Sequence, residues 1–376
     1  MTATVHGHAD PAFQGLRTLM QELIESGEED GASLVINVAG QNVVDLWGGY
    51  ADAGRTQPWA QDTITNIWSS TKPVAALATL MLVDRQLLDL DAPVAQYWPE
   101  FGAEGKADVD VDVDVVLVKH LLAHTSGLSG WEQPFSVQDL YDWDTAVARL
   151  ARQKPWWAPG SASGYHSLSY GHLLGELVRR VTGQSLRHFV RDHIAGPLQA
   201  DLQIGAEEQD WSRIAPVVPP PPPQQPSPAR PSTPVTRGRR SGAAANGHSN
   251  ARGLARALSA ITLGGTVDGV KLLSPQTIDR IFDIQADGTD LALGVPIRFG
   301  IGFGLTGGAT AQAVDWLPAG RVCFWGGWGG SSIVMDLDRK VTFSYVMNKM
   351  GGGLLGSART EAYLKAAYKA LAVEGY

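Results

Sequence analysis

Ser69 and Lys72 lie three residues apart in the stretch IWSSTKPVAAL, where a polar approach meets an apolar run. If a helix begins here, the two side chains share one face, and the lysine amine can reach the serine hydroxyl. A serine hydroxyl is a poor nucleophile until a base removes its proton. The free N–H groups at a helix start would also stabilise a developing oxyanion. The pair therefore indicates nucleophilic acyl transfer, and a capping serine followed by a solvated lysine is the alternative interpretation.

Two later stretches contain the further groups that a serine hydrolase of this kind needs. Tyr165 lies in PGSASGYHSLSYGHLLGEL, after a Pro-Gly turn and just before a predicted helix. Trp325, Gly326 and Gly327 lie in FWGGWGGSSIVMDLD, on a predicted strand near the end of the chain. The tyrosine can act as a base or proton shuttle, and the glycine-rich strand can line the opposite wall of the site. Each stretch is a weak signal alone, but the combination is specific.

Together these stretches resemble the superfamily of class C β-lactamases and penicillin-binding proteins, and specifically its β-lactamase-like carboxylesterases, called family VIII. The resemblance spans about residues 10–372 and rests on SSTK (69–72), LLAHTSGL (121–128), PGSASGYHSLSYGHLLG (159–175), WGGWGGS (325–331) and YVMNKM (345–350). It implies a serine carboxylesterase acting on a small-molecule ester. It implies no metal or organic cofactor, no nucleic acid, no membrane and no obligatory protein partner.

The resemblance also implies a role for each residue that matches the family pattern. Ser69 would be the acylated nucleophile. Lys72 would share its proton network and keep Tyr165 in the anionic form, although both side chains have reference pKa values near 10. Tyr165 would act as general base in acylation and return the proton to the leaving group. The oxyanion hole would consist of the backbone N–H groups of Ser69 and Trp328.

Two positions depart from the pattern of the penicillin-recognising enzymes, and both concern substrate binding. Ser167 replaces the usual asparagine of the tyrosine element, and Trp325 replaces the cation that begins the strand element. Because that cation serves substrates with a carboxylate, an indole favours neutral, hydrophobic esters. Ser167, Trp325, Gly326 and Gly327 are therefore predicted to contact the substrate. Five further tryptophans are candidates for an apolar acyl or alcohol pocket: Trp131, Trp156, Trp157, Trp316 and Trp328.

Other functions remain open on the same residues. An acyltransferase, a β-lactamase, an amidase or a D-aminopeptidase would use the same serine and lysine. The missing cation at Trp325 argues against the β-lactamase and peptidase versions. A non-catalytic binding protein on this fold would typically lack the serine, lysine or tyrosine, and all three are present.

Three other motifs fail on inspection. The stretch DVDVDVDV (108–115) lacks the glycine at position six and the glutamate at position twelve of a calcium loop, so an exposed strand or loop is predicted. His120 and His124 have the spacing of a zinc helix, but no glutamate follows the first histidine. A G-x-S-x-G elbow is absent from the sequence, which argues against an α/β-hydrolase.

The composition bounds the class of protein. The chain has 376 residues, 44% of them hydrophobic, and a formal net charge of -8, so it has ample core material and no basic footprint for nucleic acid. One cysteine, Cys323, cannot form an internal disulfide, which fits a reducing compartment. The N-terminus lacks the pattern of a signal peptide, and the longest apolar run, 74–83, is too short for a membrane helix. We therefore expect a soluble, cytoplasmic protein.

The pattern of elements predicts an α+β fold like that of the serine β-lactamases. Helices are predicted over 11–27, 73–88 and 357–372, at several places within 115–215, and after Ser249 or Asn250. Strands are predicted for ASLVINVAG, QNVVDLWGGYAD and much of the last third. Segments from both ends would form one antiparallel sheet flanked by helices, as a discontinuous domain of residues 1–72 and 250–376. Residues 73–249 would form a mainly helical domain with an extended proline-rich loop at 216–242, and the active site would lie between the two.

Overall fold

A computed structural model of the protein describes residues 4–106, 115–220 and 245–374. The predicted loop at 108–115 lies outside the described residues except for its last residue, and the loop at 216–242 lies outside them after residue 220. The start of the second loop runs beside the end of a strand, because the N–H of Val218 donates to the carbonyl of Asn348 at 2.8 Å.

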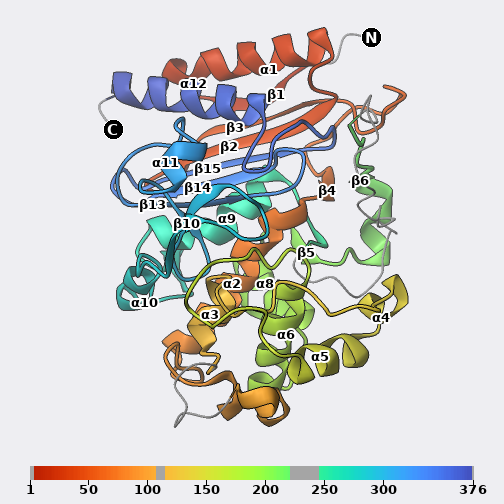
Figure 1. Cartoon of the computed structure of the whole chain (residues 1–376). Helices are drawn as coiled ribbons and strands as arrows, with labels where there is room; N and C mark the ends of the chain where they lie inside the picture. Colours follow the sequence, from red (N-terminus) through yellow and green to blue (C-terminus); the bar gives the residue numbers. More distant parts are fainter. Residues whose placement is uncertain (1–3, 107–114, 221–244, 375–376) are drawn as a thin grey trace.

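One large antiparallel sheet joins the two ends of the chain. Its nine described strands have the order β1-β3-β2-β15-β14-β13-β12-β11-β10 (Figure 1). The strands are β1 (His6–Ala9), β2 (Gly31–Val38), β3 (Gln41–Gly49), β10 (Ala286–Thr289), β11 (Pro296–Phe299), β12 (Gly304–Leu305), β13 (Val322–Gly326), β14 (Ser332–Asp336) and β15 (Val341–Met347). The two ends meet where β2 pairs with β15, with Leu34 opposite Tyr345. The predicted sheet from both termini is confirmed, and so is the α+β class.

Helices cover both faces of this sheet, which explains why all eight residues of β2 are buried. Alternate side chains of a strand point to opposite faces. Leu34 packs into the core under α1 (Gln14–Ser26) and α12 (Ala358–Glu374), whereas Val35 packs into the core that contains α9 (Ala251–Thr262). Figure 1 shows α1 and α12 together on one face and α9 on the other. The cap of α9 is Asn250, whose side chain accepts the N–H of Gly253 at 2.9 Å.

The middle of the chain is mainly helical. Its helices are α2 (Lys72–Asp84), α3 (Val118–Leu122), α4 (Val137–Tyr141), α5 (Trp143–Arg152), α6 (Ser169–Thr182), α7 (Leu186–Val190) and α8 (Gly196–Leu198). Two short helices come from the last third: α10 (Pro275–Arg280) contacts α2, whereas α11 (Thr310–Ala313) packs against β11 of the large sheet. Helix α2 contacts α6, α7 and α9, and its apolar run is buried on all sides. It ends at Asp84 rather than at the predicted Leu88, because Gln86 adopts a left-handed φ of 59°. No helix in the described ranges is long and apolar enough to cross a bilayer.

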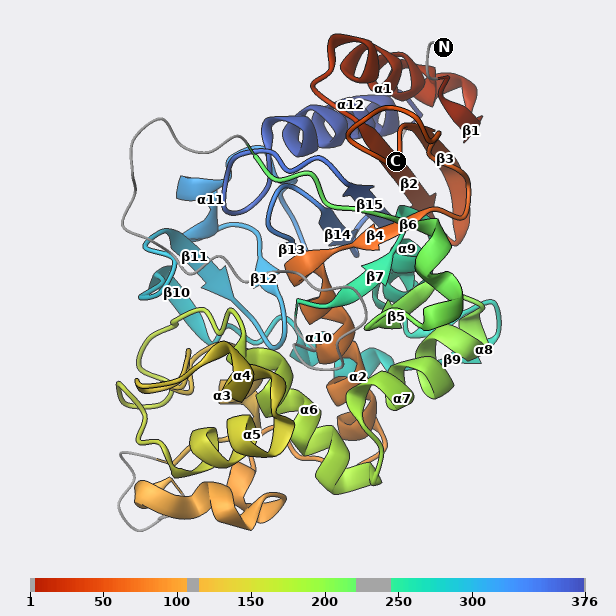
Figure 2. The same ribbon diagram turned by 90° about the vertical axis from the view of Figure 1, so that its right-hand side faces the viewer.

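A second, small sheet was not predicted from the sequence. It has the order β5-β7-β4-β6 and lies between the large sheet and the helical part (Figure 2). Its strands are β4 (Ile64–Asn66), β5 (Leu202–Ile204), β6 (Ile214–Ala215) and β7 (Gly247–Ser249). Because β4 ends just before Ser69, this small sheet sets the direction in which the chain enters the serine turn.

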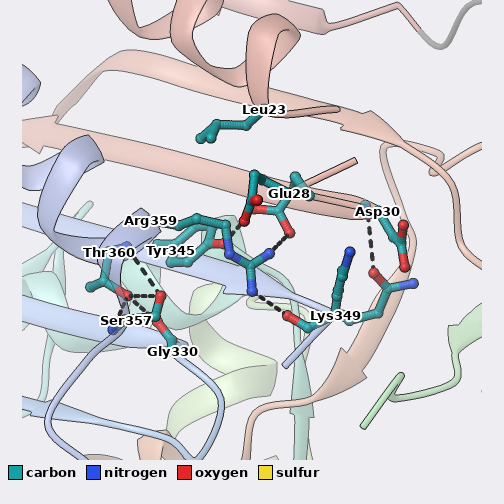
Figure 3. A network of polar contacts seen from close by, with 12 residues as sticks. Leu23, Glu28, Asp30, Gly330, Tyr345, Lys349, Ser357, Arg359 and Thr360 are labelled. Carbon is teal, nitrogen blue, oxygen red and sulfur yellow. Dashed lines mark hydrogen bonds and ion pairs between the residues drawn. The ribbon is translucent and has the colours of Figure 1, made fainter. Parts of the chain in front are cut away.

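A buried charged network ties the end of α1 to the start of α12. The carboxyl group of Glu29 is fully buried and contacts the Arg359 guanidinium and the Tyr345 hydroxyl. Arg359 also donates to the carbonyl of Lys349 (Figure 3). Burial raises the pKa of Glu29 to about 7, although Arg359 and Tyr345 both act to lower it. The native state therefore holds a proton at Glu29 that an unfolded carboxyl group loses near its usual pKa of 4.5.

We expect Glu29→Gln to change how stability depends on pH. Between the unfolded and the folded pKa of Glu29, the native state binds more protons, so wild-type stability falls as pH rises from about 5 to about 7. A glutamine cannot ionise. Over this window, the free energy of unfolding of the variant should therefore rise relative to that of the wild type by on the order of 3 kcal/mol. Urea unfolding of both proteins at several pH values measures the difference. Parallel stability curves would contradict the assigned pKa shift.

Candidate active site

Ser69 lies in a tight turn that precedes helix α2. The turn is a 3-10 helix, Trp68–Thr71, and α2 begins directly after it with Lys72. Pro73 follows in the first turn of the helix, as predicted. Trp68 adopts a left-handed φ of 48°, which costs a non-glycine residue about 1–3 kcal/mol. The Thr71 hydroxyl holds this strained turn from both sides, since it donates to the carbonyl of Trp68 and accepts the N–H of Gly247 at 2.9 Å.

Lys72 reaches back to the serine as the sequence predicted. Its Nζ lies 3.1 Å from Ser69 Oγ and 2.8 Å from the carbonyl oxygen of Ser167. The lysine is 1% exposed, whereas Ser69 is partly accessible. Burial disfavours the ammonium form and lowers the pKa of Lys72 to about 7. A substantial fraction of this amine is therefore neutral near pH 7 and able to accept a proton.

Tyr165 meets the same serine from the loop before α6. Its hydroxyl is hydrogen-bonded to Ser69 and accepts the indole N–H of Trp325 at 3.1 Å. The Nζ of Lys72 lies 4.8 Å from the centre of its ring. Burial raises the pKa of Tyr165, and the hydrogen bonds from Ser69 and Trp325 offset only part of that rise. The expected resting phenolate is thus not favoured: the electrostatics favour a neutral tyrosine beside a lysine that is partly neutral near pH 7.

Asp290 supports Tyr165 from the loop between β10 and β11, and the sequence analysis missed it. Its Oδ1 accepts the backbone N–H of Tyr165 at 3.0 Å, and those of Ala292 and Leu293 at 2.9 and 2.8 Å. The side chain is fully buried, and its Oδ2 has no hydrogen-bond partner among the described residues. In the sequence, Asp290 looks like an ordinary turn aspartate, because its two local bonds follow a common turn pattern. The bond to Tyr165 had no signal in the sequence.

His124 packs behind the tyrosine as a neutral group. Its ring centre lies 4.9 Å from that of Tyr165, and its Nδ1 accepts the backbone N–H of His166 at 3.1 Å. Burial lowers its pKa well below the usual range. His120, the other half of the rejected zinc pattern, instead accepts the N–H of Leu117 at 3.2 Å. The described residues contain no cluster of three or more ligand side chains that could hold a metal ion.

The glycine-rich strand ends against the serine turn. A Cβ atom added to Gly327 would lie 2.3 Å from both the Ile67 carbonyl oxygen and Ser331 Oγ, so only glycine fits there. Ser331 fastens the contact, because its hydroxyl donates to the Ile67 carbonyl at 3.0 Å. The next residue, Trp328, is 56% exposed, and its ring meets that of Trp68 at 5.3 Å between centres. The two predicted oxyanion donors thus belong to neighbouring segments, and their joint action on an oxyanion remains a prediction.

The remaining predicted residues lie in different surroundings. Trp325 is 4% exposed and packs behind Tyr165. Its indole therefore supports the tyrosine and forms little of an open pocket wall. Ser167 contributes its backbone carbonyl to Lys72, and its side chain is exposed. For two of the tryptophans, the predicted place in an apolar pocket was wrong. Trp131 is buried in the helical core against Phe135, and Trp316 packs into the core beneath α12.

Residues 16–368 match the protein family described as Beta-lactamase. This protein belongs to the Beta-lactamase family. The match includes each of the predicted catalytic segments, so the resemblance derived from SSTK and the later motifs is confirmed at the level of the family. The family alone leaves the reaction open, since the serine and lysine can serve several acyl-transfer reactions.

Three similar proteins extend this assignment over nearly the whole chain. Esterase/beta-lactamase LipL of Mycobacterium tuberculosis (strain ATCC 25618 / H37Rv) is 32% identical over 377 residues, which cover 92% of this chain and 83% of LipL. A crystal structure of a family VIII carboxylesterase is 34% identical, with a TM-score of 0.86, and the match covers 98% of this chain and 100% of that one. A penicillin-binding protein homolog from Caulobacter crescentus is 36% identical, with a TM-score of 0.88 and the same coverage. The predicted fold is confirmed by both structures.

Proposed function

We propose that this protein is a serine carboxylesterase that hydrolyses neutral, hydrophobic esters through an acyl-enzyme on Ser69. The observation that carries the proposal is the buried amine of Lys72, 3.1 Å from Ser69 Oγ, with a pKa lowered to about 7. A neutral amine at this distance can take the serine proton as the hydroxyl attacks. The similarity to LipL, named an esterase/beta-lactamase, and to a family VIII carboxylesterase supports an ester substrate.

In acylation, Lys72 is the proton acceptor and Ser69 the nucleophile. The Ser167 carbonyl holds one N–H of the amine, which leaves the nitrogen lone pair for the serine proton. Ser69 Oγ then bonds to the ester carbonyl carbon, and negative charge develops on the carbonyl oxygen. The backbone N–H groups of Ser69 and Trp328 stabilise that charge. The result is a tetrahedral intermediate beside a lysine ammonium.

Tyr165 completes the cycle as a proton shuttle. Its neutral hydroxyl, hydrogen-bonded to Ser69, donates a proton to the leaving alkoxide and is reprotonated from Lys72. The C–O bond to the alcohol breaks, and the acyl group stays on Ser69. A water molecule then repeats the sequence as nucleophile, with its proton passing to the Lys72–Tyr165 pair. The carboxylic acid leaves and the serine is restored.

The surroundings of the site favour apolar substrates. Exposed large apolar side chains are normal when scattered, but here several adjoin site residues. Leu168 follows Ser167, Leu291 follows Asp290, and Trp328 follows the glycine strand; all three are exposed. The described site holds a tryptophan where a carboxylate-binding enzyme would have a cation. An uncharged ester with an apolar acyl or alcohol group fits these surroundings best.

Parallel assays on two substrates test the proposal. We expect turnover of p-nitrophenyl butyrate to exceed that of a chromogenic cephalosporin by at least about a hundredfold, because the cephalosporin carboxylate lacks a cation partner near Trp325. β-Lactam opening is the second candidate, favoured by the combined name of LipL. Faster lactam than ester turnover would overturn the substrate assignment. Addition of a short alcohol to the ester assay, with detection of a new ester, would reveal an acyltransferase.

A further inference from the structure

The turn that follows β13, residues 327–330, sits directly on the segment that leads into α12. Gly329 and Gly330 have φ values of 93° and 117°, in the region that favours glycine. A Cβ atom on Gly329 would lie 2.7 Å from Met350 Cγ, and one on Gly330 would lie 2.5 Å from Ser357 Oγ. The turn has no room to shift toward this segment. The position of the segment therefore determines the position of the turn.

Hydrogen bonds fix the carbonyl groups of this turn from outside. The hydroxyl of Thr360 donates to the carbonyl of Gly330 at 2.7 Å, and the N–H of Gly351 donates to the carbonyl of Gly329 at 2.8 Å. Within the turn, the N–H of Gly330 donates to the carbonyl of Gly327 at 3.0 Å. The Gly327 carbonyl and the Trp328 N–H belong to one planar peptide group. A constraint on Gly330 therefore sets the direction in which the Trp328 N–H points.

Thr360 caps the start of α12 and makes one further hydrogen bond that capping does not require. Ser357 and Thr360 bond reciprocally, since the Thr360 N–H donates to Ser357 Oγ at 3.3 Å and the Ser357 N–H donates to Thr360 Oγ1 at 3.1 Å. This arrangement is a capping box for α12. The donation from Thr360 to Gly330 is additional, and Figure 3 shows the three residues together. Thr360 is fully buried, and the adjacent Arg359 is anchored by Glu29.

We propose that Thr360 is a positioning residue for the oxyanion hole, acting through Gly330 on the backbone N–H of Trp328. This inference rests on the proposed function. Thr360 does not touch the nucleophile or its proton partners. Its hydroxyl aims one N–H group at the place where charge develops in the transition state, which is where small displacements have large effects on rate. The effect should fall on kcat and leave binding of the ground-state ester intact.

Thr360→Val and Thr360→Ser form a matched pair for the test. Valine keeps the branched shape and removes the hydroxyl, whereas serine keeps the hydroxyl and removes the methyl group. We expect valine to lower kcat for p-nitrophenyl butyrate by about 10- to 100-fold with KM within about twofold of wild type. Serine should keep kcat within about threefold of wild type. Inhibition by phenylboronic acid, which forms a tetrahedral adduct on a catalytic serine, should weaken in valine by the same factor as kcat.

Ser357→Ala separates the positioning role from the capping role. It breaks the box but leaves the Thr360–Gly330 bond, so it should lower the urea midpoint while kcat stays within about threefold of wild type. If valine does not fold, Thr360→Ala removes the hydroxyl without added bulk and takes its place. Wild-type kcat in a folded variant that lacks the hydroxyl, or equal losses in valine and serine, would overturn the proposal. Survival of ester hydrolysis in Ser69→Ala would instead show that the proposed function is wrong.

Discussion

Ser69→Ala is expected to lower kcat for p-nitrophenyl butyrate by at least about a thousandfold, because the substitution removes the hydroxyl that forms the acyl-enzyme in the proposed mechanism. Loss of one nucleophile leaves only the residual rate enhancement from substrate binding and oxyanion stabilisation. Ser69 is partly accessible at a strained turn, and its hydroxyl bridges Lys72 and Tyr165. Initial-rate assays measure the loss. Labelling with a fluorophosphonate, followed by peptide mass analysis, should place the label on Ser69.

Ser70→Ala is the matched control for this substitution. Ser70 lies in the same turn, but its side chain is fully buried and its hydroxyl lies 3.0 Å from that of Ser331. The same chemical change at this neighbour removes a structural hydrogen bond and should keep activity within about tenfold of wild type. Ester hydrolysis that survives in Ser69→Ala, or a label on another residue, would remove Ser69 from the mechanism.

Lys72→Met should reduce kcat/KM by about 100- to 10,000-fold and remove the acidic limb of the pH profile. Methionine fills similar space without an amine. In the proposed mechanism, the lysine must be unprotonated to accept the serine proton, and its pKa is lowered to about 7 by burial. The rate should therefore rise as pH increases through about 7 and level off above it. Stopped or continuous assays from about pH 5 to about pH 9 give the profile.

Tyr165→Phe distinguishes the two possible bases. If Lys72 accepts the serine proton and Tyr165 serves as shuttle, the phenylalanine variant loses most turnover but keeps the rise near pH 7, because the amine is still present. If a phenolate is the base, the rise disappears with the hydroxyl group. Near wild-type rates in a folded Tyr165→Phe variant would exclude the tyrosine from proton transfer altogether.

The sequence was sufficient to predict that Ser69, Lys72 and Tyr165 belong to one cluster, because each lies in a short local pattern. Ser69 and Lys72 are held together by one turn of chain, and Tyr165 follows a Pro-Gly turn at a helix start. The protonation states of Lys72 and Tyr165 could not be predicted from the sequence. They depend on burial, and burial of Lys72 and Tyr165 results from packing of segments that are far apart in the sequence. The resting phenolate was expected from the neighbouring lysine, and the burial of Tyr165, which the sequence does not reveal, disfavours it.

Supporting groups were missed where they act through the backbone. The Ser167 carbonyl holds Lys72, but a carbonyl group is common to every residue and leaves no trace in the sequence. Asp290 holds the Tyr165 N–H across a large sequence separation. Trp325 was recognised as a departure from the family pattern, although its burial behind Tyr165 was not foreseen. The large sheet was predicted because its central strands are runs of β-branched and other apolar residues, whereas the small sheet has strands of two or three residues that carry no such pattern.

The pairing of β2 with β15 has a consequence for how the protein is made. On the ribosome, β2 and β3 emerge long before the partner of β2, which lies at Val341–Met347. The edge of β2 that pairs with β15 therefore stays uncovered until β15 has been synthesised, and such unpaired strand edges promote aggregation. The two walls of the candidate active site are also synthesised at different times, because Ser69 precedes Gly327 by most of the sequence. A nascent chain thus carries the proposed nucleophile without a complete site until the strand that contains Gly327 has been made.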